Sequence, residues 1–404
     1  MPSRRWPLML VVALLAGRAL TPARQLDAPA AVSAGIDVLR AESFSRLAGR
    51  RVALLTNLAA HAADGRSTLD VVRSAPSVQL VALFTPEHGL TATEDAAVAS
   101  SREPGTGLPV HSLYGQTQRP TADMLQGIDV ILVDLPDVGA RFYTYMTTVA
   151  YLMEEAAKAH VAVMVLDRPN PLNGVAVEGP TLDADLLSFV GYFPMPVRHG
   201  LTLGELARLF NAERRIGADL AVVSARGWSR EMWFDQTGLQ WHNPSPNIRT
   251  LSAATLYPGL GAIESSNLSV GRGTPTPFEH FGAPWLDGRR VADVLNSRRI
   301  PGVRFAETSF TPDSSVYAGQ RCSGVSITIT DRAALRPVRM GLEIAGALLR
   351  EHPDRYDLGR TAQLLGSRDA LALLRNGEDP AVIAALWTAD EARWRELRSM
   401  YLLY

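Results

Sequence analysis

Residues 130–143 read VILVDLPDVGARFY, so that a short apolar run passes directly into a polar turn marked by Pro and Gly. The run at 130–133 contains only branched apolar residues, which is typical of parallel strands buried on both faces. Residues 78–84 and 161–166 are also rich in Val and Leu and end in similar polar motifs. Because ligands of open α/β sheets bind at the carboxyl ends of the strands, these motifs are expected to form one catalytic site.

Strand-like and helix-like segments alternate around these runs. Further strands are predicted at 51–56 and 220–223, and helices at 68–74, 121–126, 144–160 and 202–213. This alternation predicts βαβ units and an α/β fold with a mostly parallel sheet. Right-handed crossovers would place the helices on both faces of that sheet.

The pattern changes after Gly227. Gly and Pro dominate residues 243–284, which are therefore predicted to be loops with specified turns. The rest of the chain mixes predicted helices with predicted strands and indicates a smaller α+β domain from about residue 250. The helices are expected at 290–297, 338–351, 362–375 and 390–402, and the strands at 303–310 and 325–330.

The composition is that of a globular protein with a large core. The chain has 404 residues, which is long enough for two domains. Of these residues 47% are hydrophobic and 20% are charged, as in typical globular proteins. The formal net charge of −1 gives no basis for binding nucleic acid, so no nucleic-acid partner is expected. Cys322 is the only cysteine, so no disulfide can form within the chain.

The N-terminus resembles a secretory signal. Arg4 and Arg5 precede an apolar run at 7–16, and Ala/Pro-rich sequence follows. The run is too short for a stable membrane anchor. Residues 1–30 are therefore interpreted as a signal peptide and linker, and the protein is expected to be exported to the periplasm or the extracellular space. An uncleaved anchor or a wrongly assigned start is the alternative.

Glu87 is the first candidate for catalysis. It follows the predicted strand at 78–84 and stands between Pro86 and the pair His88-Gly89, which fix and turn the backbone. A carboxylate held in this way can act as a general acid. The alternative is a solvated loop glutamate. His88 could be the proton carrier instead of Glu87, or it is a loop histidine that donates a backbone hydrogen bond.

The motif at 134–143 supplies four candidates for substrate binding. One of Asp134 and Asp137 is expected to bind a ligand hydroxyl, and the other to cap the helix that follows. Arg141 is a candidate anion contact, and Tyr143 is a candidate to pack against a sugar ring. Tyr145 could do the same, but packing on the helix face is the preferred interpretation of this residue.

Two further motifs complete the predicted site. The sequence DRPNP at 167–171 forms a rigid loop suited to holding Arg168 and Asn170, and Glu178 is expected to return to the same crevice. His199 either contacts the ligand or packs within its loop. Thr202 and Glu205 have the spacing of a helix capping box, so no catalytic role is assigned to them.

Several motifs for other chemistries are absent from the sequence. It contains no G-x-G-x-x-G, no phosphate-binding P-loop, no G-x-S-x-G and no H-E-x-x-H. The histidines are dispersed, so no cofactor and no metal are expected, although a Mg²⁺ or Ca²⁺ site built from carboxylates stays open.

The motifs together resemble those of the NamZ-type exo-β-N-acetylmuramidases, a family formerly known only as a domain of unknown function. The matching segments are 35–39, 54–57, 84–89, 109–115, 134–145, 166–172, 178–180, 199–202, 244–247 and 264–284. The resemblance implies a Rossmann-like domain at 34–250, a smaller α+β domain at 251–404 and an active site in the cleft between them. It also adds Asn267 and Arg272 to the candidates for substrate binding.

The activity that the resemblance implies is release of terminal N-acetylmuramic acid from the non-reducing end of peptidoglycan fragments. The substrate would be a muropeptide or disaccharide derived from peptidoglycan, with Glu87 in the position of the catalytic glutamate of the family. Another exo-glycosidase on the same fold and a non-catalytic cell-wall sugar-binding protein are the alternatives.

Two roles stay open at the level of sequence. The second catalytic group could be Asp134, Asp137, Glu178, Glu264, a tyrosine or the substrate itself. The lactyl carboxylate of muramic acid is expected to be bound by an arginine, since a guanidinium grips a carboxylate through two parallel bonds. Arg168 is preferred over Arg141 and Arg272 because prolines fix its loop. The alternative for Arg168 is a structural salt bridge to Asp134 or Asp167.

Overall fold

The larger sheet of the protein is parallel except at one edge. The computed structural model describes residues 1–2 and 32–404. In it the sheet has seven strands in the order β3-β4-β2-β1-β5-β6-β7, and only the β3–β4 pair is antiparallel. The strands are β1 (Arg51–Thr56), β2 (Gln79–Thr85), β3 (Ser101–Arg102), β4 (Pro109–Ser112), β5 (Val130–Asp134), β6 (Ala162–Leu166) and β7 (Leu220–Val223). The predicted mostly parallel sheet is confirmed.

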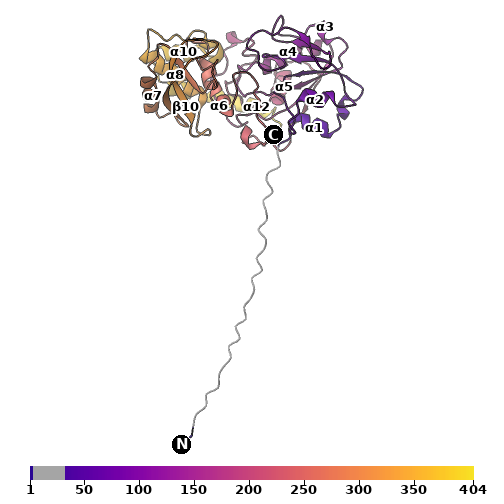
Figure 1. The fold of residues 1–404 in the computed structure, drawn as a ribbon, viewed down its shortest axis with the longest axis horizontal. Helices are drawn as coiled ribbons and strands as arrows, with labels where there is room; N and C mark the ends of the chain where they lie inside the picture. Colours follow the sequence, from indigo (N-terminus) through magenta and orange to yellow (C-terminus); the bar gives the residue numbers. More distant parts are fainter. Residues whose placement is uncertain (3–31) are drawn as a thin grey trace. The chain divides into compact units, whose positions relative to one another are not determined.

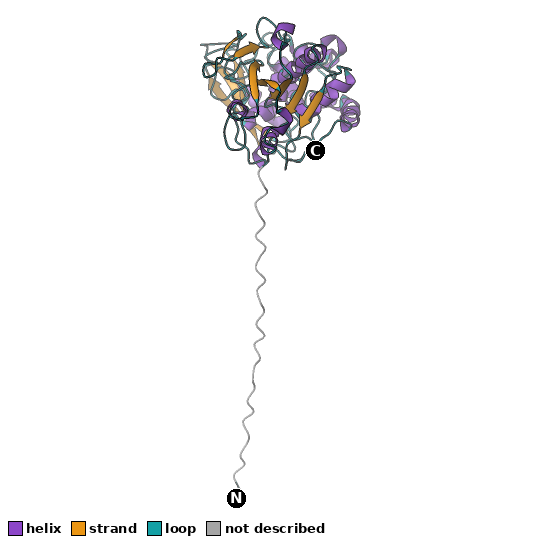
Figure 2. Ribbon diagram, turned by 90° about the vertical axis from the view of Figure 1, so that its right-hand side faces the viewer, coloured by secondary structure: helices purple, strands orange, loops and turns teal. Residues whose placement is uncertain are grey.

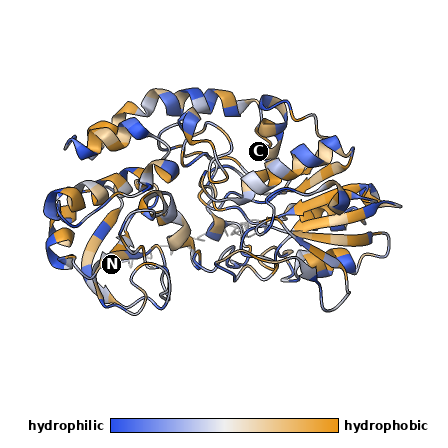
Figure 3. Ribbon diagram, turned by 90° about the horizontal axis from the view of Figure 1, so that it is seen from above, coloured by the Kyte–Doolittle hydropathy of each residue, from blue (hydrophilic) through white to orange (hydrophobic). Residues whose placement is uncertain are grey.

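Helices cover both faces of this sheet. They are α1 (Gly35–Ala41), α2 (Thr68–Arg73), α3 (Ala122–Leu125), α4 (Tyr145–Lys158) and α5 (Leu203–Glu213), with short 3₁₀ helices at Ser45–Leu47, Ala184–Leu186 and Phe234–Gln236. Val130 and Leu132 of β5 pack in one apolar cluster with residues of α1 and α2. Ile131 and Val133 face the opposite way, into a cluster with residues of α4 and α5. Burial on both faces explains why the strands are almost continuously apolar, as their colouring in Figure 3 shows.

The second part of the chain holds a three-stranded antiparallel sheet in the order β8-β10-β9. Its helices lie together around this sheet in Figure 1, and Figure 2 shows the distribution of helices and strands. The elements are α6 (Leu251–Ile263), β8 (His280–Ala283), α7 (Gly288–Ser297), β9 (Val303–Phe310), β10 (Cys322–Ile329), α8 (Pro337–Glu351), α9 (Thr361–Leu365), α10 (Arg368–Arg375), α11 (Pro380–Leu386) and α12 (Thr388–Ser399). The predicted smaller part with mixed helices and strands is confirmed.

Helix α6 corrects the prediction that residues 243–284 are loops. Pro258, Gly259 and Gly261 belong to this Gly- and Pro-rich stretch, but all three lie inside the helix and are buried. A Cβ atom on Gly259 would lie 2.0 Å from the carbonyl oxygen of Pro337, and one on Gly341 would lie 2.5 Å from the carbonyl oxygen of Gly259. The glycines therefore allow α6 and α8 to pack with their backbones in close contact.

The prediction of one helix at 362–375 is also wrong in detail. The chain forms α9 and α10, separated at Gly366, which has a φ of 85°. That left-handed conformation ends α9, as is common for glycine after a helix. A Cβ atom at this position would lie 2.2 Å from Nη2 of Arg141, so the glycine also makes room for that side chain.

The C-terminal segment returns to the larger sheet. Trp394 of α12 donates from Nε1 to the carbonyl oxygen of His199 at 2.8 Å, and Arg398 donates from Nη1 to that of Gly200 at 2.7 Å. The hydroxyl of Tyr404 donates to Asp167 at 2.8 Å. One apolar cluster includes residues from both parts of the chain. The domain boundary near residue 250 stays a prediction.

The signal-like segment lies outside the described residues. Within the described ranges, no helix has the length and apolar character needed to cross a bilayer. The interpretation of residues 1–30 as a signal peptide and linker therefore stays a prediction.

Candidate active site

Glu87 lies on a tight turn at the carboxyl end of β2. The amide of Gly89 donates to the carbonyl oxygen of Pro86 at 3.1 Å, and both His88 and Gly89 have left-handed backbones, with φ values of 70° and 69°. A non-glycine residue in this region is uncommon and is often found at functional sites. The half-buried Glu87 side chain accepts a hydrogen bond at Oε2 from the Thr144 hydroxyl, at 2.5 Å.

The Glu87 carboxylate lines a cavity. Both parts of the chain contribute to its walls, so the cavity lies between the larger sheet and the helices of the second part. We call it the Glu87 cavity; its lining includes Glu87, His88, Asp95, Tyr114, Phe142, Tyr143, Thr144, Ser245, Asn247, Tyr257, Glu264, Arg272, Phe278 and Leu364.

A network of charged side chains from both parts of the chain lines the Glu87 cavity. Glu264, which follows α6, accepts from Nε of Arg272 at 2.9 Å. Nη1 of the same arginine lies 3.4 Å from Oδ1 of Asp95, which also accepts at Oδ2 from the side chain of Asn247 at 3.1 Å. Burial lowers the pKa of Arg272, but the Glu264 carboxylate more than offsets this and the net pKa is raised. The guanidinium therefore keeps its charge at every physiological pH.

Tyrosines provide neutral hydrogen-bond donors on the sheet side. Burial raises the pKa of Tyr114, and the neighbouring Glu87 carboxylate raises it further, so the phenol stays protonated. Tyr143 and Tyr145 donate from their hydroxyls to the same carbonyl oxygen, that of Pro244, at 3.0 and 2.7 Å. Tyr143 lines the Glu87 cavity and its side chain is buried, so its packing against a sugar ring stays a prediction.

His88 braces the turn that carries Glu87. Its Nδ1 lies 2.5 Å from the carbonyl oxygen of Glu94 and 4.0 Å from Oδ1 of Asp95. Of the two interpretations of His88, the geometry fits the loop histidine, although the residue also lines the cavity. Its predicted role as a proton carrier stays untested.

Arg168 and Asp134 form a salt bridge outside the Glu87 cavity. Nε of Arg168 donates to Oδ1 of Asp134 at 2.5 Å and Nη2 donates to Oδ2 at 2.8 Å, while Thr68 adds a further bond to the carboxylate. Asp134 is fully buried. Both of its oxygens are occupied, so it neither offers a free oxygen to a ligand hydroxyl nor caps α4. The structural salt bridge, the alternative to lactyl recognition by Arg168, is the arrangement observed.

Asp137 and His199 lie close together beside Arg168. Oδ2 of Asp137 accepts from the amide of Gly139 at 2.8 Å and lies 3.8 Å from Nε2 of His199. Burial raises the pKa of Asp137 to about 7. Burial, reinforced by surrounding arginines, lowers the pKa of His199 to about 3, so this imidazole is neutral. The amide of Leu201 donates to Nδ1 of His199, which leaves the ring proton on Nε2.

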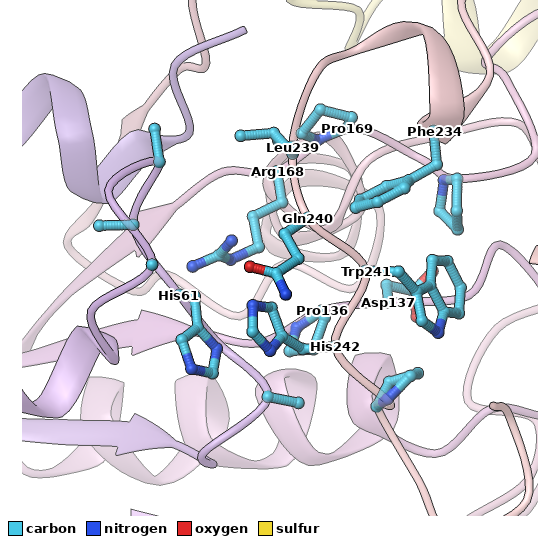
Figure 4. A pocket seen from close by; sticks show the side chains of 16 residues that line it. His61, Pro136, Asp137, Arg168, Pro169, Phe234, Leu239, Gln240, Trp241 and His242 are labelled. Atoms are coloured by element: carbon cyan, nitrogen blue, oxygen red, sulfur yellow. The ribbon is translucent and has the colours of Figure 1, made fainter. Parts of the chain in front are cut away.

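Asp137 and Arg168 line a second cavity, which we call the Asp137 cavity (Figure 4). It is formed by segments that follow β1, β5 and β6 and by the segment at 234–244; its lining includes His61, Pro136, Asp137, Arg168, Pro169, Pro171, Phe234, Leu239, Gln240, Trp241, His242 and Pro244. The single site expected at the carboxyl edge of the sheet is therefore two cavities. Glu87, Tyr143 and Arg272 belong to one, and Asp137 and Arg168 to the other.

Arg141 and Asn170 have structural positions rather than the predicted contacts with substrate. Arg141 is fully buried and donates through Nη1 and Nη2 to four carbonyl oxygens, those of Pro180, Met195, Leu364 and Leu365. Burial lowers the pKa of Arg141 to about 9. Asn170 is also buried, and its amide donates to the carbonyl oxygen of Leu201 at 2.8 Å. Neither side chain lines the Glu87 cavity or the Asp137 cavity, and backbone carbonyl groups bind both Nη atoms of Arg141 and the amide nitrogen of Asn170.

Glu178 and Asn267 also hold backbone segments together. Glu178 is buried; it accepts from the amide of Arg339 at 2.9 Å and lies 3.6 Å from the guanidinium of Arg336. Asn267 donates to the carbonyl oxygen of Arg355 at 2.7 Å and accepts from the amide of Asp357 at 2.9 Å. Both lie away from the two cavities, so the prediction that they contact substrate does not fit this structure.

The sequence reasoning missed Tyr114 and Asp95 as residues of the Glu87 cavity. Tyr114 follows the short strand β4, and its position after a strand was a usable signal. Asp95 stands in a loop without any local motif and meets Arg272 only in the folded chain. No group of three or more His, Cys, Asp and Glu side chains in the part of the chain that the structure describes is arranged to hold a metal ion.

Comparison with known families places most of the chain in two matched regions. Residues 52–252 match the family described as exo-beta-N-acetylmuramidase NamZ, N-terminal, and residues 255–404 match its C-terminal counterpart. A curated relative, the peptidoglycan beta-N-acetylmuramidase NamZ of Bacillus subtilis, is 40% identical over 378 residues, which cover 92% of this chain and 91% of the relative.

Solved structures show the same fold. A DUF1343 family protein from Bacteroides fragilis superposes with a TM-score of 0.84 at 35% identity, covering 92% of this chain and 99% of that one. A second DUF1343 family protein from the same organism gives a TM-score of 0.76 at 28% identity with the same coverage.

Proposed function

We propose, from the premise that this chain belongs to the NamZ family of exo-β-N-acetylmuramidases, that it is a glycosidase that removes terminal N-acetylmuramic acid from the non-reducing end of peptidoglycan fragments. The observation that carries the proposal is the position of Glu87. Its carboxylate is held by Thr144 in a cavity that Glu264 and Arg272 also line. Two carboxyl groups that flank one cavity are what hydrolysis of a glycosidic bond requires.

We assign the general acid to Glu87. A positioned carboxylic acid protonates the leaving oxygen as the glycosidic bond breaks, and its position must be fixed for this to be efficient. The strained turn and the Thr144 hydroxyl both fix the side chain. Since Thr144 engages Oε2, we assign Oε1 to the contact with the glycosidic oxygen.

We assign the second catalytic group to Glu264. Of the four carboxylates considered from the sequence, Asp134, Asp137 and Glu178 lie elsewhere, whereas Glu264 lines the Glu87 cavity. Its bond with Arg272 holds the carboxylate in one orientation. Glu264 would act either on a water molecule or directly on the sugar, and the configuration of the released sugar, observed by NMR at early times, distinguishes these two mechanisms.

We assign recognition of the lactyl carboxylate to Arg272. Of the three arginines considered from the sequence, Arg141 is enclosed by carbonyl groups and Arg168 is paired with Asp134, while Arg272 lines the Glu87 cavity. Its Nη1 contact with the exposed Asp95 is long, at 3.4 Å, so this nitrogen can turn toward a carboxylate of the ligand.

Turnover of paired chromogenic substrates tests the proposal. The full chain is expected to release the chromophore from a β-glycoside of N-acetylmuramic acid and to leave the N-acetylglucosamine analogue almost untouched. Cleavage of the glucosamine analogue instead would indicate another exo-glycosidase. Binding of the muramic acid glycoside without any cleavage would indicate a sugar-binding protein.

We further propose that the protein is exported. The proposal is supported by the signal-like residues at the N-terminus and by a substrate that belongs to the cell wall. Fractionation of the source cells followed by N-terminal sequencing is expected to find a shortened chain outside the cytoplasm. A chain with its first residues intact, found only in the cytoplasm, would contradict export.

A further inference from the structure

The Asp137 cavity concentrates polar atoms that have no hydrogen-bond partner within the described ranges of the chain. They are Oδ1 of Asp137, Nδ1 of His61, Nε1 of Trp241 and Nε2 of His242, all buried at the atom. Nε2 of His199, which lies 3.8 Å from Asp137, is a fifth. Buried polar atoms are normally paired, and a group of unpaired atoms around one cavity therefore calls for a ligand.

Asp137 is the most telling member of this group. Its side chain is only 7% exposed, and while Oδ2 is bound by the amide of Gly139, Oδ1 is left without a partner among residues 32–404. The neighbouring Arg168 is already paired with Asp134, so it does not neutralise the charge of Asp137. A ligand hydroxyl that donates to Oδ1 would satisfy this oxygen.

The walls of the cavity are aromatic and rigid. The rings of Phe234 and Trp241 meet edge to face, with centroids 5.1 Å apart, and those of His61 and His242 stack at 3.5 Å (Figure 4). Four prolines complete the lining, at positions 136, 169, 171 and 244. Proline fixes the backbone, so the cavity needs little ordering before a ligand enters.

The charges around the cavity favour a neutral ligand. The guanidinium of Arg168 is compensated by the buried Asp134. Burial lowers the pKa of His242, with further contributions from His61 and Arg168, so this ring is neutral at physiological pH. A free peptide or an anionic sugar would bring charges that the walls do not balance.

We propose that the Asp137 cavity binds one neutral N-acetylated amino sugar, with its hydroxyls on Asp137 and the Trp241 N–H and its apolar face against the aromatic wall. An apolar surface combined with a few fixed donors and acceptors is the usual composition of a site for such a ligand. The choice of an N-acetylated sugar rests on the proposed muramidase function, whereas the existence of the site rests on the geometry alone.

The site is separate from the cavity proposed for catalysis. The hydroxyls of Tyr143 and Tyr145 both donate to the carbonyl oxygen of Pro244, and these three residues form a common wall. Pro244 lines the Asp137 cavity and Tyr143 lines the Glu87 cavity. A sugar in the Asp137 cavity would therefore hold a peptidoglycan fragment at a second point instead of taking part in the reaction.

Calorimetric titration with diacetylchitobiose, a neutral disaccharide of N-acetylglucosamine, tests the proposal. The full chain carrying Glu87→Gln is used, so that turnover cannot interfere. We expect this protein to bind the probe, and Asp137→Asn or Trp241→Phe added to it to weaken binding about tenfold. Trp285→Phe is the matched control, because its N–H already donates to the Tyr317 hydroxyl at 2.9 Å, away from both cavities.

The outcomes are distinct. Failure of the parent to bind, equal binding by all variants, or equal weakening by Trp285→Phe would overturn the proposal, as would preferential binding of a free stem peptide. If either variant unfolds, a crystal structure of Glu87→Gln with the probe decides: sugar in the Asp137 cavity supports the site, and sugar in the Glu87 cavity alone overturns it. Turnover of the muramic acid glycoside by the unmodified chain is measured separately, so failure of the proposed function is recognised independently.

Discussion

The Glu87 cavity and the Asp137 cavity lie at the same edge of the larger sheet, but their charges are organised differently. In the Asp137 cavity the arginine is paired with a carboxylate of the neighbouring strand, and every lining residue comes from the first part of the chain. In the Glu87 cavity, Glu264 and Arg272 of the second part line the same cavity as Glu87. The two strand ends therefore differ in what the second part of the chain adds: it brings charged side chains to the cavity proposed for catalysis and contributes none of the residues that line the other.

The largest expected effect separates the two cavities by rate. Glu87→Gln removes a positioned acid and is expected to lower kcat on the natural disaccharide by roughly 10²–10⁴. Asp137→Asn is expected to lower kcat at least about tenfold less than Glu87→Gln, because Asp137 lies outside the cavity proposed for catalysis. Steady-state kinetics of both variants provide the check, and a loss in Asp137→Asn as large as that in Glu87→Gln would break the comparison.

The second prediction uses the buried carboxyl of Asp137. Burial raises its pKa to about 7 in the folded chain, whereas the unfolded value is about 3.9. Ionisation of the buried Asp137 carboxyl therefore lowers the free energy of unfolding. This loss of stability is absent below about pH 4, grows as the pH rises and is complete above about pH 7. Asp137→Asn has no such carboxyl. The unfolding free energy of the variant minus that of the parent should therefore increase by up to about 4 kcal/mol between pH 4 and pH 7.

Urea unfolding at several pH values between 4 and 8 measures this difference. Burial also raises the pKa of the neighbouring Asp167, to about 6, but this residue is present in both proteins and cancels. His199 stays neutral throughout, because its pKa is lowered to about 3. A difference in stability that does not change with pH would show that Asp137 is not a desolvated carboxyl.

The third prediction concerns an arginine that belongs to neither cavity. Arg141→Met leaves four carbonyl oxygens without their charged donor. The unfolding free energy is expected to fall by roughly 3 kcal/mol or more, since each unsatisfied buried acceptor costs about 1–3 kcal/mol. Arg249→Met, which removes an exposed guanidinium bound to a single carbonyl oxygen, is the control with little expected change. A similar, small loss in both variants would contradict the structural role.

The smallest expected effect tests the proposal that Arg272 binds the lactyl carboxylate. Arg272→Met is expected to lower kcat/KM for muramic acid substrates by about 10–100-fold, corresponding to about 1.5–3 kcal/mol, and to affect binding of neutral sugars less. Arg168→Met should change stability more than it changes this selectivity. If Arg168→Met instead erases the preference for muramic acid, the lactyl group is bound in the Asp137 cavity.

The strands of the larger sheet could be predicted from the sequence because strands that are buried on both faces consist of continuous apolar runs. Residues 51–56 and 220–223 coincide with β1 and β7. Helix α6 could not be predicted, since its glycines and proline are the same signals that mark loops. Their role is close contact with α8, which depends on a partner about 80 residues away.

The candidate site was predictable in outline and not in its pairings. Strand ends indicated that Glu87 and Asp137 would lie at one edge of the sheet, and they do. The sequence could not show that Arg168 is paired with Asp134. Recognition of a lactyl carboxylate and a structural salt bridge would both use the same arginine in the same motif. Nor could the sequence show that Arg141 is enclosed by carbonyl groups from segments up to 224 residues away.

The dependence of the Glu87→Gln defect on the leaving group tests the central claim most directly. The parent and the variant are compared on the natural disaccharide and on an aryl muramic acid glycoside whose phenol leaves without protonation. If Glu87 is the general acid, the loss is roughly 10²–10⁴ on the disaccharide and at least about tenfold smaller on the aryl glycoside. Equal losses on both substrates, or turnover of the disaccharide at the parent rate, would contradict the assignment.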